Sequence, residues 1–164
     1  MKRVYGWVLI AAVAFAPVAL FAQAQGAKPA PAAAGKGRLI EINTGDDMKF
    51  SVVEIAAKPG ELLTVRLKSV GTLPKVAMGH NFVLLKGGVN LLDFANDPAN
   101  AASRDTDFIP AARKGDVLAA TKMIGPGETD EVTFSAPKAA GAYNYLCTFI
   151  GHFAAGMRGR LTVK

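Results

Sequence analysis

From residue 38 onward, apolar and polar residues alternate in short runs separated by turn residues. The clearest run covers residues 62–68, where Leu63, Val65 and Leu67 share one face and polar residues fall between them. This period of two predicts strands with one buried face. Seven further runs of this kind cover residues 38–43, 48–55, 80–85, 116–122, 129–135, 142–147 and 158–163. In the run 48–55 the apolar residues change face midway, which predicts a bulge or a change of register.

The segments between these runs carry turn and loop residues. Lys58-Pro59-Gly60 predicts a turn, and residues 124–128 predict a loop between two strands. Residues 88–113 instead hold a cluster of Asp, Asn, Pro and Ala, and we expect a long connection that contains a short helix. Short strands with turn residues at this spacing predict an antiparallel β-sandwich or barrel.

Residues 1–24 have the features of a secretory signal peptide. Lys2 and Arg3 are basic, residues 4–22 are almost wholly apolar, and Ala22-Gln23-Ala24 matches the small-x-small cleavage pattern. The apolar stretch is also long enough for an uncleaved membrane anchor, which needs about 20 residues. Cleavage is the favoured interpretation because of the cleavage pattern.

Residues 25–37 are rich in Pro, Ala and Gly without apolar periodicity, which predicts a flexible or semi-extended tether. The folded domain is expected at residues 38–164, in the periplasm, either free or held near the membrane by this tether. Loss of residues 1–24 lowers the net charge from +6 to +4, with 17 basic and 13 acidic residues left. Because no basic run or RNA-type aromatic motif occurs, we expect no nucleic-acid partner.

Cys147 is the only cysteine of the chain. A secreted domain that relied on disulfides would carry an even number of cysteines. The thiol is therefore an inert buried group, a reactive group or a metal ligand. A free thiol in an oxidising compartment calls for a specific role.

Cys147 belongs to a group of four residues that suits copper. Four residues separate it from His152, and four more separate His152 from Met157, so one loop between two predicted strands holds all three. His80, the other histidine of the chain, stands far upstream at the start of a predicted strand. Two His and one Cys with a weak axial Met form the blue-copper electron-transfer site. Each residue alone could serve packing instead, but the joint spacing favours one copper bound by all four.

Two other functions compete with electron transfer. A copper oxidase or nitrite reductase needs a second copper site built from extra histidines, and both histidines of this chain are already used. A copper storage or delivery protein would favour an open Met- or His-rich site, whereas the five methionines form no such cluster. We therefore expect a one-electron carrier and not an enzyme.

The residues around His152 predict a docking face for redox partners. Phe149 and Phe153 flank this histidine and Met78 precedes His80, so these side chains would form a small apolar patch around the imidazole edge. Weak redox complexes use small interfaces. The alternative is that the two phenylalanines pack beneath the loop.

Several stretches of the chain resemble the cupredoxins, and within them the azurin and auracyanin group. The stretches are Met78-Gly79-His80-Asn81-Phe82-Val83-Leu84, residues 121–128, Tyr145-Leu146-Cys147-Thr148-Phe149-Ile150-Gly151-His152 and Met157-Arg158-Gly159-Arg160-Leu161-Thr162-Val163. The resemblance extends from about Arg38 to Lys164. It implies an all-β fold, a Greek-key β-sandwich or barrel of about eight strands with one short helical insertion, and copper at one end.

The resemblance also implies a role for each site residue. The strong ligands would be His80, Cys147 and His152, and Met157 would be the weak axial ligand. The carbonyl of Gly79 would be a second, distant axial contact. Asn81 and Thr148 match a pair that joins the two ligand-bearing loops by hydrogen bonds, which fixes ligand orientation. We expect a monomer whose partners are cytochromes or other electron-transfer proteins.

Three departures from the azurin pattern carry expectations of their own. The chain lacks the two further cysteines that azurins join in a disulfide, so stability would come from the core and the metal. The gap from His152 to Met157 is one residue longer than in azurin, which favours the auracyanin-like branch and a weaker Gly79 contact. Ile150 stands where many relatives have proline. Its N–H would donate a second hydrogen bond to the Cys147 sulfur and raise the reduction potential.

Overall fold

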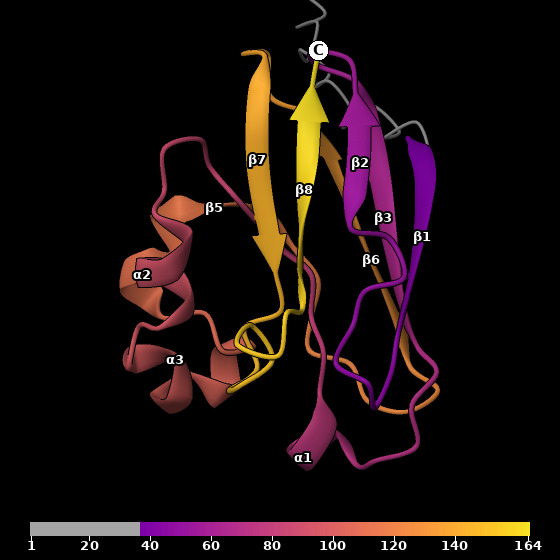
Figure 1. Cartoon of the computed structure of the whole chain (residues 1–164), viewed down its shortest axis with the longest axis vertical. Helices are drawn as coiled ribbons and strands as arrows, with labels where there is room; N and C mark the ends of the chain where they lie inside the picture. The colour runs from indigo at the N-terminus through magenta and orange to yellow at the C-terminus, as the bar shows by residue number, and fades with distance from the viewer. Residues whose placement is uncertain (1–36) are drawn as a thin grey trace, which may run out of the picture. The chain divides into compact units, whose positions relative to one another are not determined.

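Eight strands form two sheets in residues 37–164, the part of the chain that this computed structural model describes (Figure 1). The three-stranded sheet has the order β1 (Arg38–Thr44), β3 (Leu62–Ser69) and β6 (Thr129–Ser135). The five-stranded sheet has the order β2 (Glu54–Ala57), β8 (Arg158–Val163), β7 (Gly141–Leu146), β4 (Val83–Leu85) and β5 (Val117–Ala120). The predicted all-β sandwich is confirmed. The predicted signal peptide and the predicted tether up to residue 36 lie outside the described residues.

The core between the sheets follows the period of two in the sequence. Leu63, Val65 and Leu67 of β3 are fully buried and face the interior. Tyr145 of β7 and Leu161 of β8 meet them from the other sheet. Each fully buried side chain of this size contributes about 1.5–3 kcal/mol of hydrophobic stabilisation. The alternation therefore determines which face of each strand is buried.

Two of the strand pairs are parallel, so the prediction of an antiparallel sandwich was wrong for them. β1 pairs with β3 and β2 pairs with β8 in parallel, whereas the pairs that involve β4, β6 and β7 are antiparallel. β1 and β2 follow each other in sequence but belong to different sheets. Alternation of apolar residues sets the face of a strand and not its direction, because the side-chain period is the same for both.

Three predicted strands are shorter in the structure than in the sequence pattern: the run 116–122 is reduced to β5, and two other runs begin with an irregular segment. In the run 48–55, Met48 has a left-handed backbone with φ 54°, Phe50 makes an isolated bridge to Thr44, and the strand begins only at Glu54. In the run 80–85, His80 makes an isolated bridge to Ile124 before β4 begins. Both irregular segments lie at the end of the sandwich where the β7–β8 loop is found (Figure 1).

The connection between β4 and β5 is helical in several short pieces. It contains α2 (Leu91–Ala95), α3 (Ala99–Ala102), η1 (Arg104–Thr106) and η2 (Ala111–Asp116). The sequence predicted one short helix here, and it did not predict α1 (Lys75–Met78). Phe94, Ile109 and Phe153 form a second apolar cluster with residues of β4 and β7, which fixes the connection against the sheet. Within residues 37–164, none of the helices has the length and apolar character needed to cross a bilayer.

Candidate metal centre

Three buried side chains converge at one end of the sandwich. His80, Cys147 and His152 each offer a ligand atom, and these atoms all lie within 4.8 Å of one another. The two imidazole rings are 4.9 Å apart between centroids, and the Cys147 Sγ is 3.5 Å from the His152 Nδ1. Donors of these types at this separation can hold a single metal ion.

The β7–β8 loop supplies two of these residues and closes on itself through its backbone. The Cys147 N–H donates to the Met157 carbonyl at 3.1 Å, and the Met157 N–H donates to the His152 carbonyl at 2.9 Å. Gly156 takes φ 95°, a conformation that favours glycine and lets the loop return to β8. Met157 is fully buried and belongs to the same apolar cluster as Cys147. The loop thus places all three of its predicted ligands at the same end of the core.

His80 reaches the centre from the segment between α1 and β4. Its N–H donates to the Ile124 carbonyl at 2.9 Å, and its carbonyl accepts from the Ile124 N–H at 2.7 Å. Gly79 precedes it in a crowded position, because a Cβ there would lie 2.8 Å from the Lys75 carbonyl oxygen and 2.9 Å from the Met123 Cγ. Only a residue without a side chain allows this close approach of the backbone.

Asn81 and Thr148 join the two ligand-bearing segments. The Asn81 Nδ2 donates to the Thr148 Oγ1 at 2.8 Å, and the Thr148 N–H donates to the Asn81 Oδ1 at 2.9 Å. Both residues are buried, and each follows a predicted ligand directly in sequence. The pair therefore holds His80 and Cys147 at a constant separation, as outer-shell partners of metal ligands do.

Burial sets the protonation of the three predicted strong ligands. It lowers the pKa of His152 to about 4, with a further contribution from His80, and it also lowers the pKa of His80. Burial raises the pKa of the Cys147 thiol to about 12. Both imidazoles are thus neutral, as metal ligands must be, while the thiolate requires a cation beside it.

His80 also provides an independent test of whether a metal fits. Both of its ring nitrogens are buried and neither makes a hydrogen bond of good geometry, although the Gly45 backbone lies close enough to oppose the lowering of the pKa of the ring. Buried polar atoms without partners are rare and costly in native proteins. A metal ion beside Cys147 would satisfy one of these nitrogens and stabilise the thiolate as well. The donor set therefore fits a copper ion.

Two backbone N–H groups act on the Cys147 sulfur. Those of Asn81 and Phe149 each lower the pKa of the thiol, although burial outweighs them. The hydrogen bond from the Ile150 N–H to the Cys147 sulfur stays a prediction.

The predicted docking residues differ in their exposure. Met78 and Phe149 are half-buried, whereas Phe153 is only 8% exposed and packs in the second apolar cluster with the Arg158 guanidinium over its ring. Ile150 is 51% exposed and is the large apolar side chain that the loop presents to solvent. The exposure of Ile150, which precedes His152 together with Phe149, adds it to the predicted apolar patch.

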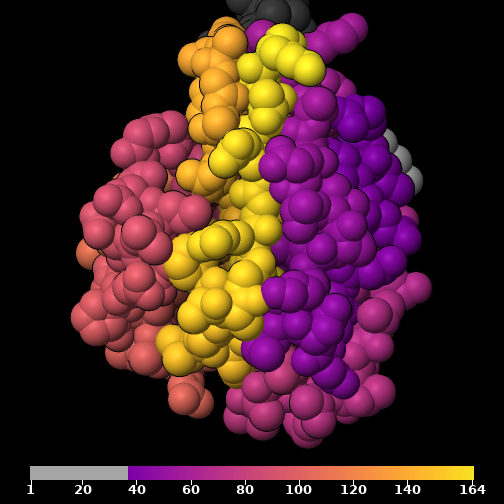
Figure 2. All heavy atoms as spheres, in the orientation of Figure 1, coloured from indigo at the N-terminus to yellow at the C-terminus, as the bar shows by residue number. Residues whose placement is uncertain are grey.

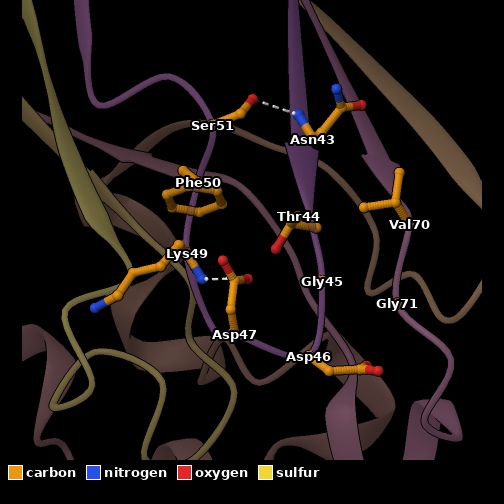
Figure 3. Close-up of a pocket in the computed structure, with 10 residues that line it drawn as sticks. All are labelled: Asn43, Thr44, Gly45, Asp46, Asp47, Lys49, Phe50, Ser51, Val70 and Gly71. Carbon is orange, nitrogen blue, oxygen red and sulfur yellow. Dashed lines mark hydrogen bonds between the residues drawn. The ribbon is translucent and has the colours of Figure 1, made fainter.

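The loop lies at the surface between two other parts of the chain. Figure 2 shows it between the helical connection on one side and the segment between β1 and β2 on the other. An open hollow of about 470 Å³ borders that segment and is lined by the ten residues of Figure 3, none of which is a predicted ligand. Lys49, one of the ten, extends away from the hollow, and its Nζ donates to the Ala155 carbonyl of the loop. This contact ties the loop to the β1–β2 turn.

Comparison with known proteins identifies the group to which this geometry corresponds. Residues 38–164 match the family described as copper-binding proteins of the plastocyanin/azurin family. The chain is 41% identical over 130 residues to an azurin from Pseudomonas denitrificans, covering 76% of this chain and 97% of that protein. It is 42% identical over 120 residues to azurin-1 from Alcaligenes xylosoxydans xylosoxydans, covering 70% of this chain and 89% of that protein.

Solved structures agree with this match. Auracyanin A, a "blue" copper protein from Chloroflexus aurantiacus, superposes with a TM-score of 0.67 at 34% identity, covering 77% of this chain and 98% of that chain. A dithionite-reduced auracyanin from Roseiflexus castenholzii superposes with a TM-score of 0.63 at 35% identity, covering 79% of this chain and 99% of that chain.

Proposed function

Because the chain belongs to the plastocyanin/azurin family of copper-binding proteins, we propose that His80, Cys147, His152 and Met157 hold its single type 1 copper. The protein is an electron carrier and not an enzyme. The observation that carries the proposal is the convergence of two buried imidazoles and a buried thiol within 4.8 Å.

Each part of the site has a distinct task in this proposal. The bound copper supplies the chemistry by changing between two oxidation states that share these ligands. The Asn81–Thr148 pair and the backbone bonds within the β7–β8 loop resist movement of the ligands when the oxidation state changes. Gly79 completes the proposal as a weak carbonyl contact, supported by the tight packing that excludes a side chain there.

The protein works with other redox proteins, as azurin-like carriers do. We infer that cytochromes or similar electron-transfer proteins dock on the exposed surface of the β7–β8 loop. Half-buried Met78 and Phe149 and exposed Ile150 support this surface, whereas Phe153 supports the loop from beneath. A monomer suffices for the function, because one chain contributes all four proposed ligands.

We further infer that the protein acts outside the cytoplasm. The signal-peptide features of residues 1–24 and the lone cysteine support export to the periplasm. N-terminal sequencing of the protein purified from its host would distinguish a cleaved signal peptide from a retained anchor.

The test of the ligand assignment compares Met157→Leu with Met123→Leu. Both methionines are buried, at 0% and 6% exposure, but only Met157 is a proposed ligand. Since the axial ligand tunes the reduction potential, Met157→Leu should raise the potential and change the ratio of the visible bands, whereas Met123→Leu keeps an apolar side chain beside Gly79 and should change both far less. Equal effects of the two substitutions would contradict Met157 as a ligand.

A further inference from the structure

Asp107 and Phe108, in the connection after η1, have an unusual backbone. Both residues are left-handed, with φ 55° and 60°. Aspartate tolerates this conformation, but for a bulky residue such as phenylalanine it is a genuine outlier. Strain of this kind persists only where surrounding contacts enforce it, and it clusters at functional sites. The contacts of these two residues show what enforces it.

The carbonyl of Asp107 lies over the pair that joins the ligand-bearing segments. It accepts from the Asn81 Nδ2 at 2.8 Å and from the Thr148 Oγ1 at 3.1 Å. One oxygen thus receives a hydrogen bond from each member of the pair. The turn at Asp107 directs the carbonyl inward, so its backbone conformation and these two bonds depend on each other.

The carboxylate of Asp107 binds a third segment of the site. Its Oδ1 accepts from the Met123 N–H at 2.7 Å. The side chain of Met123 in turn packs where a Cβ of Gly79 would stand, with the Met123 Sδ at 3.0 Å from that position. Asp107 therefore bonds directly to neighbours of His80 and Cys147, and through Met123 it fixes the wall beside Gly79.

Phe108 reaches the surroundings of His152 through a row of aromatic rings. Its ring lies 5.1 Å from the ring of Phe149, and Phe149 lies 4.6 Å from the ring of His152. Phe108 is buried at 7% exposure. The two residues together touch the surroundings of His80, Cys147 and His152, although neither is a ligand.

We propose that Asp107 is a positioning residue of the copper site, holding the segments of His80, Cys147 and Gly79 in one arrangement before and after the metal binds. This inference rests on the proposed copper site but concerns a residue outside the ligand set. Asp107 acts through Asn81, Thr148 and Met123. Its left-handed backbone directs one carbonyl toward two hydrogen-bond donors.

The chain offers a closely matched control for a test. The Asp130 Oδ2 accepts from the Lys122 N–H at 2.8 Å, the amide next to that of Met123. Asp130→Ala therefore removes the same kind of bond from the same segment without touching Asn81 or Thr148. Asp107→Gly removes the carboxylate that bonds to the Met123 N–H, and it also frees the backbone to leave the left-handed conformation that directs the carbonyl at Asn81 and Thr148. Asp107→Asn keeps an oxygen acceptor and a residue that tolerates this conformation, so it should rescue the effect.

The first readout uses the metal-free protein. Hydrogen exchange of the Thr148 amide, which is bonded to Asn81, should become about fivefold faster in Asp107→Gly, because the carbonyl that holds Asn81 and Thr148 is then no longer fixed and about one hydrogen bond of stabilisation is lost. It should stay near wild type in Asp107→Asn and Asp130→Ala. Equal exchange rates in Asp107→Gly and Asp130→Ala would overturn the proposal.

The second readout uses the copper-loaded protein. Copper release to an excess of chelator should be about tenfold faster in Asp107→Gly than in Asp130→Ala, as for loss of an outer-shell partner. A blue wild type with equal release rates in the two variants would overturn the positioning role. A wild type without a copper charge-transfer band would instead overturn the proposed function.

Discussion

At the scale of single residues, His80 combines full burial with two ring nitrogens that make no hydrogen bond of good geometry. A buried polar group without a partner costs about 1–3 kcal/mol of stability. The structure tolerates this cost at the residue that the proposed copper would bind. Thr121 shows the opposite state, since its buried Oγ1 accepts from the Phe82 N–H at 2.9 Å. The His80 side chain therefore lowers the stability of the metal-free fold, whereas the Thr121 hydroxyl raises it.

This contrast predicts opposite effects of two apolar substitutions on the metal-free protein. His80→Leu should raise the free energy of unfolding by about 1 kcal/mol because it removes unsatisfied polar atoms. Thr121→Val should lower it by about 1–2 kcal/mol because it leaves the Phe82 amide unpaired. Urea denaturation of both variants measures the difference. A His80→Leu protein less stable than wild type would show that the imidazole is satisfied in solution.

The exposure of Ile150 predicts its role in encounters with partners. Ile150→Asp should slow electron self-exchange by about tenfold, because two copies docking through this loop would bring like charges together. The visible spectrum of the copper protein should not change. Self-exchange is measured from NMR line broadening in mixtures of the oxidised and reduced protein.

Leu39→Asp is the matched control for that experiment. Leu39 is 47% exposed near the start of β1, at the end of the sandwich away from the β7–β8 loop (Figure 1). The Leu39→Asp substitution introduces the same charge and should leave the rate of electron self-exchange near that of wild type. An equal slowing in both variants would indicate a general charge effect and not docking at the loop.

At the scale of elements, regular strands could be predicted and irregular segments could not. The bounds of β6 and β8 agree with the predicted runs, because their alternation is set by one buried face. The run 48–55 does not form one strand because Met48 takes a left-handed backbone and Phe50 packs in the core and pairs with Thr44, so regular pairing begins only at Glu54. The parallel pairs were missed because strand direction leaves no trace in the alternation. The spacing in the sequence was enough to predict that His80, Cys147 and His152 lie together, but the contacts of Asp107 depend on a fold-specific turn.

One hydrogen bond connects β7 to the irregular segment before β2. The hydroxyl of buried Tyr145 donates to the Val52 carbonyl at 2.7 Å. Tyr145→Phe should lower the free energy of unfolding by about 1 kcal/mol and speed hydrogen exchange in residues 50–53, because the carbonyl loses its partner. Thermal denaturation and amide exchange measure the two effects.

Tyr143→Phe provides the comparison for this bond. Its hydroxyl donates at 2.9 Å to the carbonyl of Ala139, an exposed residue where water can replace the bond. The substitution should change stability by less than that of Tyr145 and leave the exchange of residues 50–53 unaltered. An equal loss of protection in both variants would contradict the connecting role of Tyr145.

At the scale of the whole molecule, the domain joins a closed core to a site at one end. The lone cysteine is buried at this site, so no disulfide can form within the chain. Stability therefore comes from the two packed sheets, with bound copper adding to it by mass action. Cys147 is instead one of the proposed copper ligands.

The central claim is most directly tested by the visible absorption spectrum of the purified protein after addition of Cu(II), beside Cys147→Ser. A thiolate–copper bond predicts an intense blue charge-transfer band in wild type that is absent from the variant. Ascorbate should bleach the band and an oxidant should restore it, as one-electron transfer requires. A wild-type protein that stays colourless with Cu(II), or a variant that is equally blue, would contradict the account.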